Sequence, residues 1–161
     1  MSFDQPRIAA VFEETLSESL EGLAFIDVES RRTLGVLPEM APDDWCSAIT
    51  IEAPFTATVE LFFGKRLARD LVDAMAGGDW PVDEAAIRDS LAEVANTVVG
   101  RFMNGLLEGT GDFTISLPDC GELGERPGGT GTAPERVVLE FNLANGKMYA
   151  VYTHMEVSPA S

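Results

Sequence analysis

The chain has 161 residues, of which 45% are hydrophobic and 24% charged, so it can form one globular domain with a core and is not a disordered chain. Its formal net charge of −16 argues against partners that present phosphate backbones or anionic membrane surfaces. Two cysteines make no disulfide framework, and neither a signal-peptide pattern nor a membrane-spanning apolar stretch is present, so we expect a single cytoplasmic domain over residues 1–161.

The first predicted element is a helix over residues 6–23, where apolar side chains recur at helical spacing opposite an acidic face. Residues 25–28 fit a short strand, which a loop over residues 29–42 follows. Alternation of apolar and polar residues then predicts two strands, over 46–52 and 55–63.

Two helices come next in the prediction. A short helix over residues 64–76 ends at the pair Gly77-Gly78, and the longest helix spans about residues 83–108. A strand over residues 112–117 follows it, and the glycine-rich stretch over 119–134 predicts a long loop.

The last two strands are predicted over residues 136–143 and 147–157. The dipeptide Asn145-Gly146 between them is a strong signal for a hairpin turn. The order of elements is a helix, strands, two helices and more strands. This order predicts an α+β fold with two layers, in which long helices pack on a mostly antiparallel sheet.

The helix over residues 83–108 has an unusual exposed face. At about 100° per residue its large apolar side chains share one side, and Asp89, Glu93, Asn96, Gly100 and Asn104 share the other. Asparagine and glycine are poor helix formers, and the glycine costs about 1 kcal/mol relative to alanine. We interpret this face as a docking surface; the alternative is that the glycine lets another part of the same chain pack closely.

Glu93 and Asn96 are three residues apart, so their side chains project next to each other. A carboxylate can pair with a lysine ammonium group, and a carboxamide can orient a water molecule without titrating. This pair suits attack of water on a phosphoryl group, where positioning matters more than covalent chemistry. The phosphate and any metal would come from a partner, because the chain has no evident phosphate-binding loop.

The same residues resemble the motif of the CheC/CheX family of chemotaxis phosphatases. That motif has an acidic or serine residue, a glutamate, an asparagine and a later proline, which Asp89, Glu93, Asn96 and Pro118 match here. Between Asn96 and Pro118 lie 21 residues, one fewer than in the usual pattern. The chain carries one such motif, which is more similar to CheX than to CheC, where two copies are usual.

The resemblance implies a phosphatase that acts on the phospho-aspartate of receiver domains such as CheY. It implies that Glu93 pairs with the receiver's lysine and that Asn96 enters the receiver's pocket and orients the attacking water. The receiver would bind Mg²⁺, and this chain would need no cofactor. The resemblance also implies further contacts with the receiver, from Asp89, Gly100, Arg101 and Asn104.

Two further expectations concern association. Members of the CheX type are homodimers with a sheet that continues across subunits, and the apolar faces of the strands around Val137 and Tyr152 are compatible with this. Arg88 and Arg101 lie on the long helix, where they either reduce repulsion from an acidic partner or pair with nearby carboxylates such as Glu84.

Two other functions fit the sequence less well. One is a non-catalytic module of the same fold that binds a receiver or a flagellar-switch component, although the presence of both Glu93 and Asn96 favours the enzyme. The other is a hydrolase with its own metal, which the lack of clustered ligands disfavours, since His154 is the single histidine. We expect structural roles for the remaining candidates, namely His154, Cys46, Cys120, Trp45 and Trp80.

Overall fold

The structure is a computed structural model that describes residues 4–78, 81–125 and 136–155. Within these ranges the elements in chain order are α1 (Gln5–Ala24), β1 (Val28–Leu34), β2 (Trp45–Ala53), β3 (Thr56–Phe63), α2 (Lys65–Ala76), α3 (Glu84–Leu106), β4 (Thr114–Ile115), β5 (Asp119–Glu122), a 3-10 turn (Leu123–Glu125), β6 (Arg136–Leu143) and β7 (Gly146–Met155). No described helix combines the length and the apolar composition that crossing a membrane requires.

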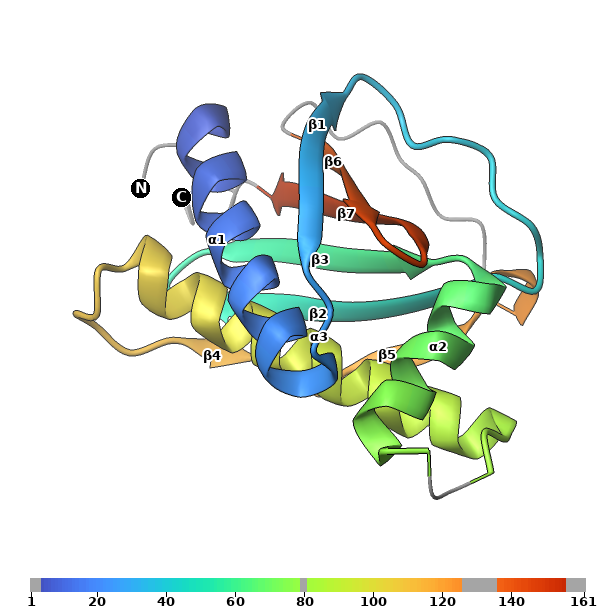
Figure 1. Ribbon diagram of the computed structural model, residues 1–161. Coiled ribbons are helices and arrows are strands. Elements are labelled where there is room, and N and C mark those ends of the chain that lie inside the picture. Colours follow the sequence, from blue (N-terminus) through green and yellow to red (C-terminus); the bar gives the residue numbers. More distant parts are fainter. Residues whose placement is uncertain (1–3, 79–80, 126–135, 156–161) are drawn as a thin grey trace.

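A seven-stranded sheet forms one layer and the helices form the other (Figure 1). The strand order is β1-β6-β7-β3-β2-β4, and β5 also pairs with β2. All six recorded strand pairings are antiparallel. The predicted α+β class, with helices packed on a mostly antiparallel sheet, is therefore confirmed.

The two long helices pack against each other in opposite directions. The guanidinium of Arg7, near the start of α1, donates a hydrogen bond of 2.6 Å to the carbonyl oxygen of Leu106 at the end of α3. Further along, the rings of Phe12 and Phe102 lie 5.1 Å apart between centroids. The apolar side of α3 is buried as its periodicity predicts, so the opposite side must face outward.

Each long helix has a clear start. Asp4 caps α1 and Asp83 caps α3, where the Asp83 carboxylate accepts a 2.8 Å hydrogen bond from the Ala86 amide. The end of α1 is less ordinary, because Phe25 takes a left-handed conformation with φ 55° and its amide donates to the carbonyl of Glu21. Phe25 therefore ends α1, and the strand predicted over residues 25–28 is wrong except at Val28, where β1 begins.

Apart from its first residue, Val28, strand β1 lies within the stretch that the sequence predicted as a loop. Its two arginines face carboxylates, with Arg31 2.6 Å from Glu13 and Arg32 3.2 Å from Glu140. Among the described strands only β6 pairs with β1, so it is an edge strand. A polar edge strand lacks the alternation that reveals a half-buried strand, which explains why the prediction missed it.

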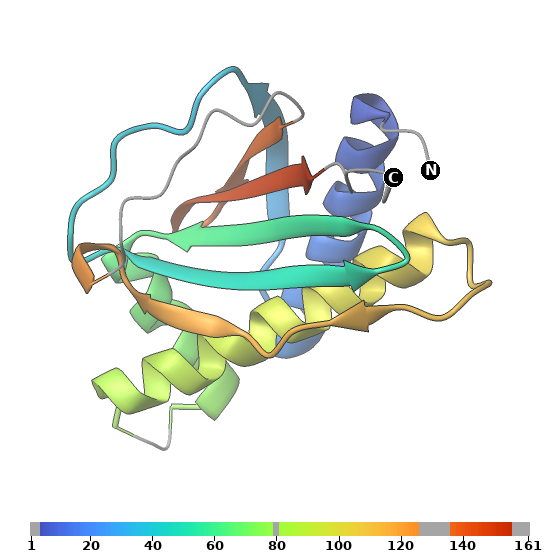
Figure 2. The same cartoon turned by 180° about the vertical axis from the view of Figure 1, so that it is seen from behind.

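The chain after α3 runs along the edge of β2 as two short strands (Figure 2). The strand predicted over residues 112–117 is reduced to β4, and its predicted apolar residue Leu117 is 89% exposed. Strand β5 and the following turn occupy the start of the predicted loop; residues 126–135 of that loop lie outside the described residues. Pro118 separates the two strands, since it has no amide hydrogen to donate to the ladder.

Candidate functional site

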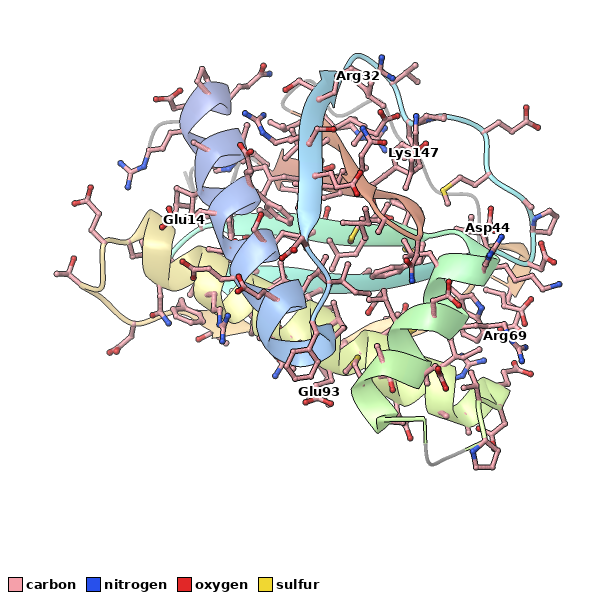
Figure 3. The ribbon with its side chains drawn as sticks, viewed as in Figure 1. Glu14, Arg32, Asp44, Arg69, Glu93 and Lys147 are labelled. Atoms are coloured by element: carbon pink, nitrogen blue, oxygen red, sulfur yellow. The ribbon has the colours of Figure 1, made fainter. Side chains whose placement is uncertain are left out.

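The predicted face of α3 is open to solvent. Asp89, Glu93, Asn96 and Asn104 are exposed and Gly100 is half-buried; these five residues are called the α3 stripe below. Figure 3 shows Glu93 pointing away from the middle of α3, below the C-terminal end of α1. The docking interpretation of the sequence required this exposure.

The side chains of Glu93 and Asn96 are not held by polar contacts with the rest of the described structure. Neither side chain has a hydrogen bond or an ion pair with any other residue that the structure describes. Val94 and Ala95, which lie between them in sequence, are buried against the core and fix the orientation of the helix. A carboxylate and a carboxamide thus stand one turn apart and can bind a visiting molecule without first breaking internal bonds.

Gly100 is not required by packing. A Cβ atom built on Gly100 would meet nothing within 4 Å, so no part of the described chain uses the space that the glycine leaves. Gly105 in the same helix differs, because a Cβ there would come 3.0 Å from Cγ1 of Val11 in α1. The alternative explanation of Gly100, close approach of a neighbouring segment, is therefore wrong for the described residues.

The family model whose description is chemotaxis phosphatase CheX matches residues 45–125, which are 81 of the 161 residues and include the whole α3 stripe. The chain belongs to the CheX family. The resemblance that the sequence motif indicated is thereby confirmed, and phosphatase activity is the activity that describes this family. A search of curated proteins finds no match.

Solved structures with the same fold include CheX of Desulfovibrio desulfuricans, with 20% identity, a TM-score of 0.76, and coverage of 92% of this chain and 99% of that one. The CheX–CheY–BeF3–Mg complex of Borrelia burgdorferi gives 17% identity, a TM-score of 0.72, and coverage of 94% and 97%. The FliM middle domain of H. pylori gives 9% identity, a TM-score of 0.60, and coverage of 94% and 92%. At these identities the likeness shows a shared CheX-like fold.

The two arginines of α3 have different surroundings in this CheX-family chain. Arg88 lies 3.1 Å from Glu84 and 3.6 Å from Glu125, and its guanidinium stacks 5.5 Å from the ring of Trp45. Desolvation alone would lower the pKa of Arg88, but the two carboxylates outweigh it and raise the pKa. Arg101 is exposed and forms no ion pair within the described ranges, so it is the arginine available to a partner.

Pro118, the last residue of the CheX motif, is not part of the α3 stripe. It is half-buried between β4 and β5, beside Ser116, whose hydroxyl accepts a 2.9 Å hydrogen bond from the Thr50 amide. The structure thus places Pro118 between the two short strands at the edge of the sheet, outside helix α3.

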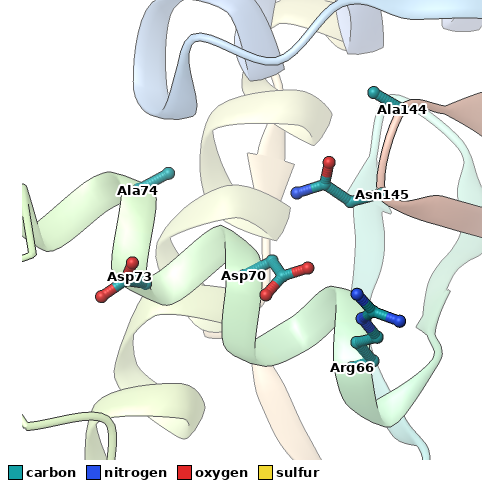
Figure 4. A pocket seen from close by; sticks show the side chains of 6 residues that line it. All are labelled: Arg66, Asp70, Asp73, Ala74, Ala144 and Asn145. Atoms are coloured by element: carbon teal, nitrogen blue, oxygen red, sulfur yellow. The ribbon is translucent and has the colours of Figure 1, made fainter.

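Two other clusters of polar residues are weaker candidates for a catalytic or metal site. A hollow between α2 and the β6–β7 turn is lined by Arg66, Asp70, Asp73 and Asn145, which carry both signs of charge and include no histidine, cysteine or hydroxyl group (Figure 4). Within the described residues one group of three possible metal ligands occurs, and Arg88 already pairs with two of its members; the group is Glu84, Glu122 and Glu125.

The residues expected to be structural behave so where they are described. His154 lies 3.0 Å from the Tyr152 hydroxyl, Trp45 is buried beneath Arg88, and Cys46 and Cys120 are buried. Trp80 lies outside the described residues.

Proposed function

We propose that this protein accelerates hydrolysis of the phospho-aspartate on a CheY-like receiver domain. The observation that carries the proposal is the exposed, uncommitted pair of Glu93 and Asn96 on α3 of a CheX-family chain. A CheX of similar fold forms a complex with CheY, which supports a receiver as the partner.

Asn96 orients the attacking water in this proposal. The carboxamide enters the receiver's pocket and accepts a hydrogen bond from a water molecule placed in line with the phosphorus. The water oxygen then bonds to phosphorus while the bond between phosphorus and the aspartyl oxygen breaks. The products are the free aspartate carboxylate and dihydrogen phosphate, which keeps both protons of the water. An amide does not titrate, so Asn96 itself adds no pH dependence.

Glu93 binds and aligns the receiver. Its carboxylate pairs with the lysine ammonium group of the receiver's active site, which fixes the position of Asn96 one turn further along α3. The rest of the contact is made by Asp89, Gly100, Arg101 and Asn104. Arg101 offsets part of the repulsion between this chain, with its net charge of −16, and an acidic receiver. The proposal places Mg²⁺ on the receiver, where it neutralises phosphoryl charge, and requires no cofactor in this chain.

The test follows phosphate release from the host's phosphorylated receivers, with and without this protein. We expect Asn96→Ala to abolish the acceleration while receiver binding persists, because it removes the group that orients water. We expect Glu93→Ala to weaken both binding and turnover. Glu14→Ala removes an exposed carboxylate from α1 and serves as the control that leaves both unchanged (Figure 3). Equally fast release with Asn96→Ala would contradict the assigned role.

A binding module without catalysis is the second candidate. The FliM middle domain shares the fold at a TM-score of 0.60, which shows that this architecture is not restricted to CheX proteins. Stable binding of a phosphorylated receiver with no change in its decay rate would favour this candidate over the phosphatase.

A further inference from the structure

Phe25 is an aromatic residue that the fold does not use. It is 86% exposed, although aromatic rings normally contribute most to a core. Its φ of 55° lies in the left-handed region, where bulky residues are strained and where helices usually end on glycine. A glycine at position 25 would end α1 without this strain and without an exposed ring, so folding alone gives no reason for phenylalanine.

Phe25 lies at the end of α1 that is near Glu93 of the α3 stripe. The contact between Phe12 and Phe102 fixes a common point on the antiparallel helices α1 and α3. From that point Phe25 lies about 20 Å along α1, and Glu93 lies about 14 Å along α3 in the same direction, at about 1.5 Å per residue. Figure 3 accordingly shows Glu93 just below the end of α1.

The α3 stripe contains no apolar side chain that a partner could bury, and Phe25 would supply one. All five residues of the stripe are polar or glycine, and protein interfaces draw most of their affinity from buried apolar anchors surrounded by such polar groups. The net charge of −16 gives no general attraction to an acidic partner, so apolar burial is the main source of affinity beside the proposed contacts of Glu93 and Arg101.

We propose that Phe25 is the apolar anchor of receiver binding, which inserts into a hydrophobic depression beside the receiver's active site while the α3 stripe covers that site. The inference rests on the proposed phosphatase function. Phe25 binds the receiver but does not touch the reacting atoms, so it sets affinity and not the rate of the chemical step.

The test uses Phe25→Gly in the full chain, measured for thermal stability and for steady-state phosphate release over a range of receiver concentration. We expect KM to rise about tenfold or more and kcat to stay within about twofold, in line with loss of a binding anchor. The melting temperature should stay unchanged or rise, because glycine relieves the left-handed strain. The control is Val36→Ala, which shortens a 73% exposed apolar side chain in the segment after β1 and should change neither KM nor stability.

Three results would overturn the inference. If KM is unchanged for Phe25→Gly while Asn96→Ala is inactive in the same assay, Phe25 is not the binding anchor, but the proposed phosphatase function is retained. A fall in melting temperature would assign Phe25 to the fold. Conversion of a dimer to a monomer by Phe25→Gly, seen by light scattering, would assign the ring to a second copy of this chain. Absence of any acceleration by the wild-type protein would instead remove the proposed function itself.

Discussion

Several residues on the exposed side of α3 have low helix propensity and leave that surface open to a partner. Gly100 leaves open space that no described part of the molecule fills, and Asn96 and Asn104 occupy positions where better helix formers would fit. The sequence predicted these exposures because helical geometry alone determines which residues share a face. It did not predict Phe25 at a helix end, because glycine is the usual residue there and the pattern gave no signal for an aromatic.

The first prediction separates function from stability at Gly100. Gly100→Ala should raise the free energy of unfolding by about 1 kcal/mol, because alanine favours the helix and its methyl group meets nothing. The same variant should give slower receiver dephosphorylation than the wild-type protein, because the methyl group occupies part of the proposed docking surface. Urea denaturation and the phosphate-release assay measure the two effects.

Gly105→Ala is the matched control for that experiment. Its methyl group would come 3.0 Å from Cγ1 of Val11, so the contact between α1 and α3 must shift and the gain in helix propensity should be lost. A Gly100→Ala variant that is less stable than wild type would contradict the open environment described for Gly100.

The second prediction concerns Tyr149, on the sheet face opposite the helices. Burial, and then the charge of Glu140, raise the pKa of Tyr149 above its ordinary value of 10.0. Above about pH 10 the unfolded chain loses the phenolic proton before the folded chain does, so the contribution of Tyr149 to stability is complete below that pH and is lost as pH rises through the folded-state pKa. Tyr149→Phe should remove this part of the alkaline loss, as measured by unfolding at pH 8 to 11.

The assignment of that titration needs a spectroscopic check, because the chain has two tyrosines. Ultraviolet absorbance of tyrosinate, compared between wild type and Tyr149→Phe, isolates the Tyr149 curve. A midpoint at or below pH 10 in the folded protein would contradict the prediction.

At the scale of elements, α3 is held on one side by Arg88. This side chain pairs with two carboxylates, stacks on Trp45 of β2 and donates a 2.7 Å hydrogen bond to the carbonyl of Cys120 in β5. Helix α3 is thereby attached to two strands, which limits the movement of the α3 stripe.

The third prediction compares the two arginines of α3. Arg88→Ala should lower the free energy of unfolding by about 1–2 kcal/mol, because a carbonyl group loses its donor and Trp45 loses its cover. Arg101→Ala should change the free energy of unfolding by less than about 0.5 kcal/mol, since Arg101 is exposed and makes no ion pair among the described residues. It should instead weaken receiver binding, most clearly at low salt. Equal loss of stability in both variants would contradict this division of roles.

The elements that the sequence predicted well are those with a buried face. The helices and the strands β2, β3, β6 and β7 follow apolar periodicity, and the Asn145-Gly146 turn joins Leu143 and Gly146 in register as a hairpin. Strands β1 and β5 were missed because their local sequences do not indicate a strand. Their pairing with β6 and β2 comes from tertiary contact, and the Asp-Cys-Gly-Glu sequence of β5 has no strand propensity of its own.

For the whole molecule, the strand order limits how two copies can share a sheet. Strands β6 and β7, whose apolar faces are compatible with a shared sheet, are each paired on both sides and leave no free edge. This order was not predictable from local patterns, because it depends on which distant strands meet. A shared sheet would have to form through an outer strand, and β1 is the longest one available within the described ranges.

The fourth prediction is that the protein is a homodimer whose sheets join through β1. Light scattering should give twice the 17.3 kDa of the chain, and hydrogen exchange of the β1 amides should slow as the concentration rises. A monomer at every concentration, or β1 amides that exchange at the same rate throughout, would contradict it.

The packing of α1 on α3 has a practical consequence for trimming the protein. The family match begins at Trp45 and therefore leaves out α1, whose Phe12 shields Phe102. A fragment limited to residues 45–125 would carry Glu93 and Asn96 but would leave an apolar seam along α3 unshielded, so it should aggregate. A minimal version that keeps the proposed activity must therefore retain the first helix, although the CheX motif lies entirely outside it.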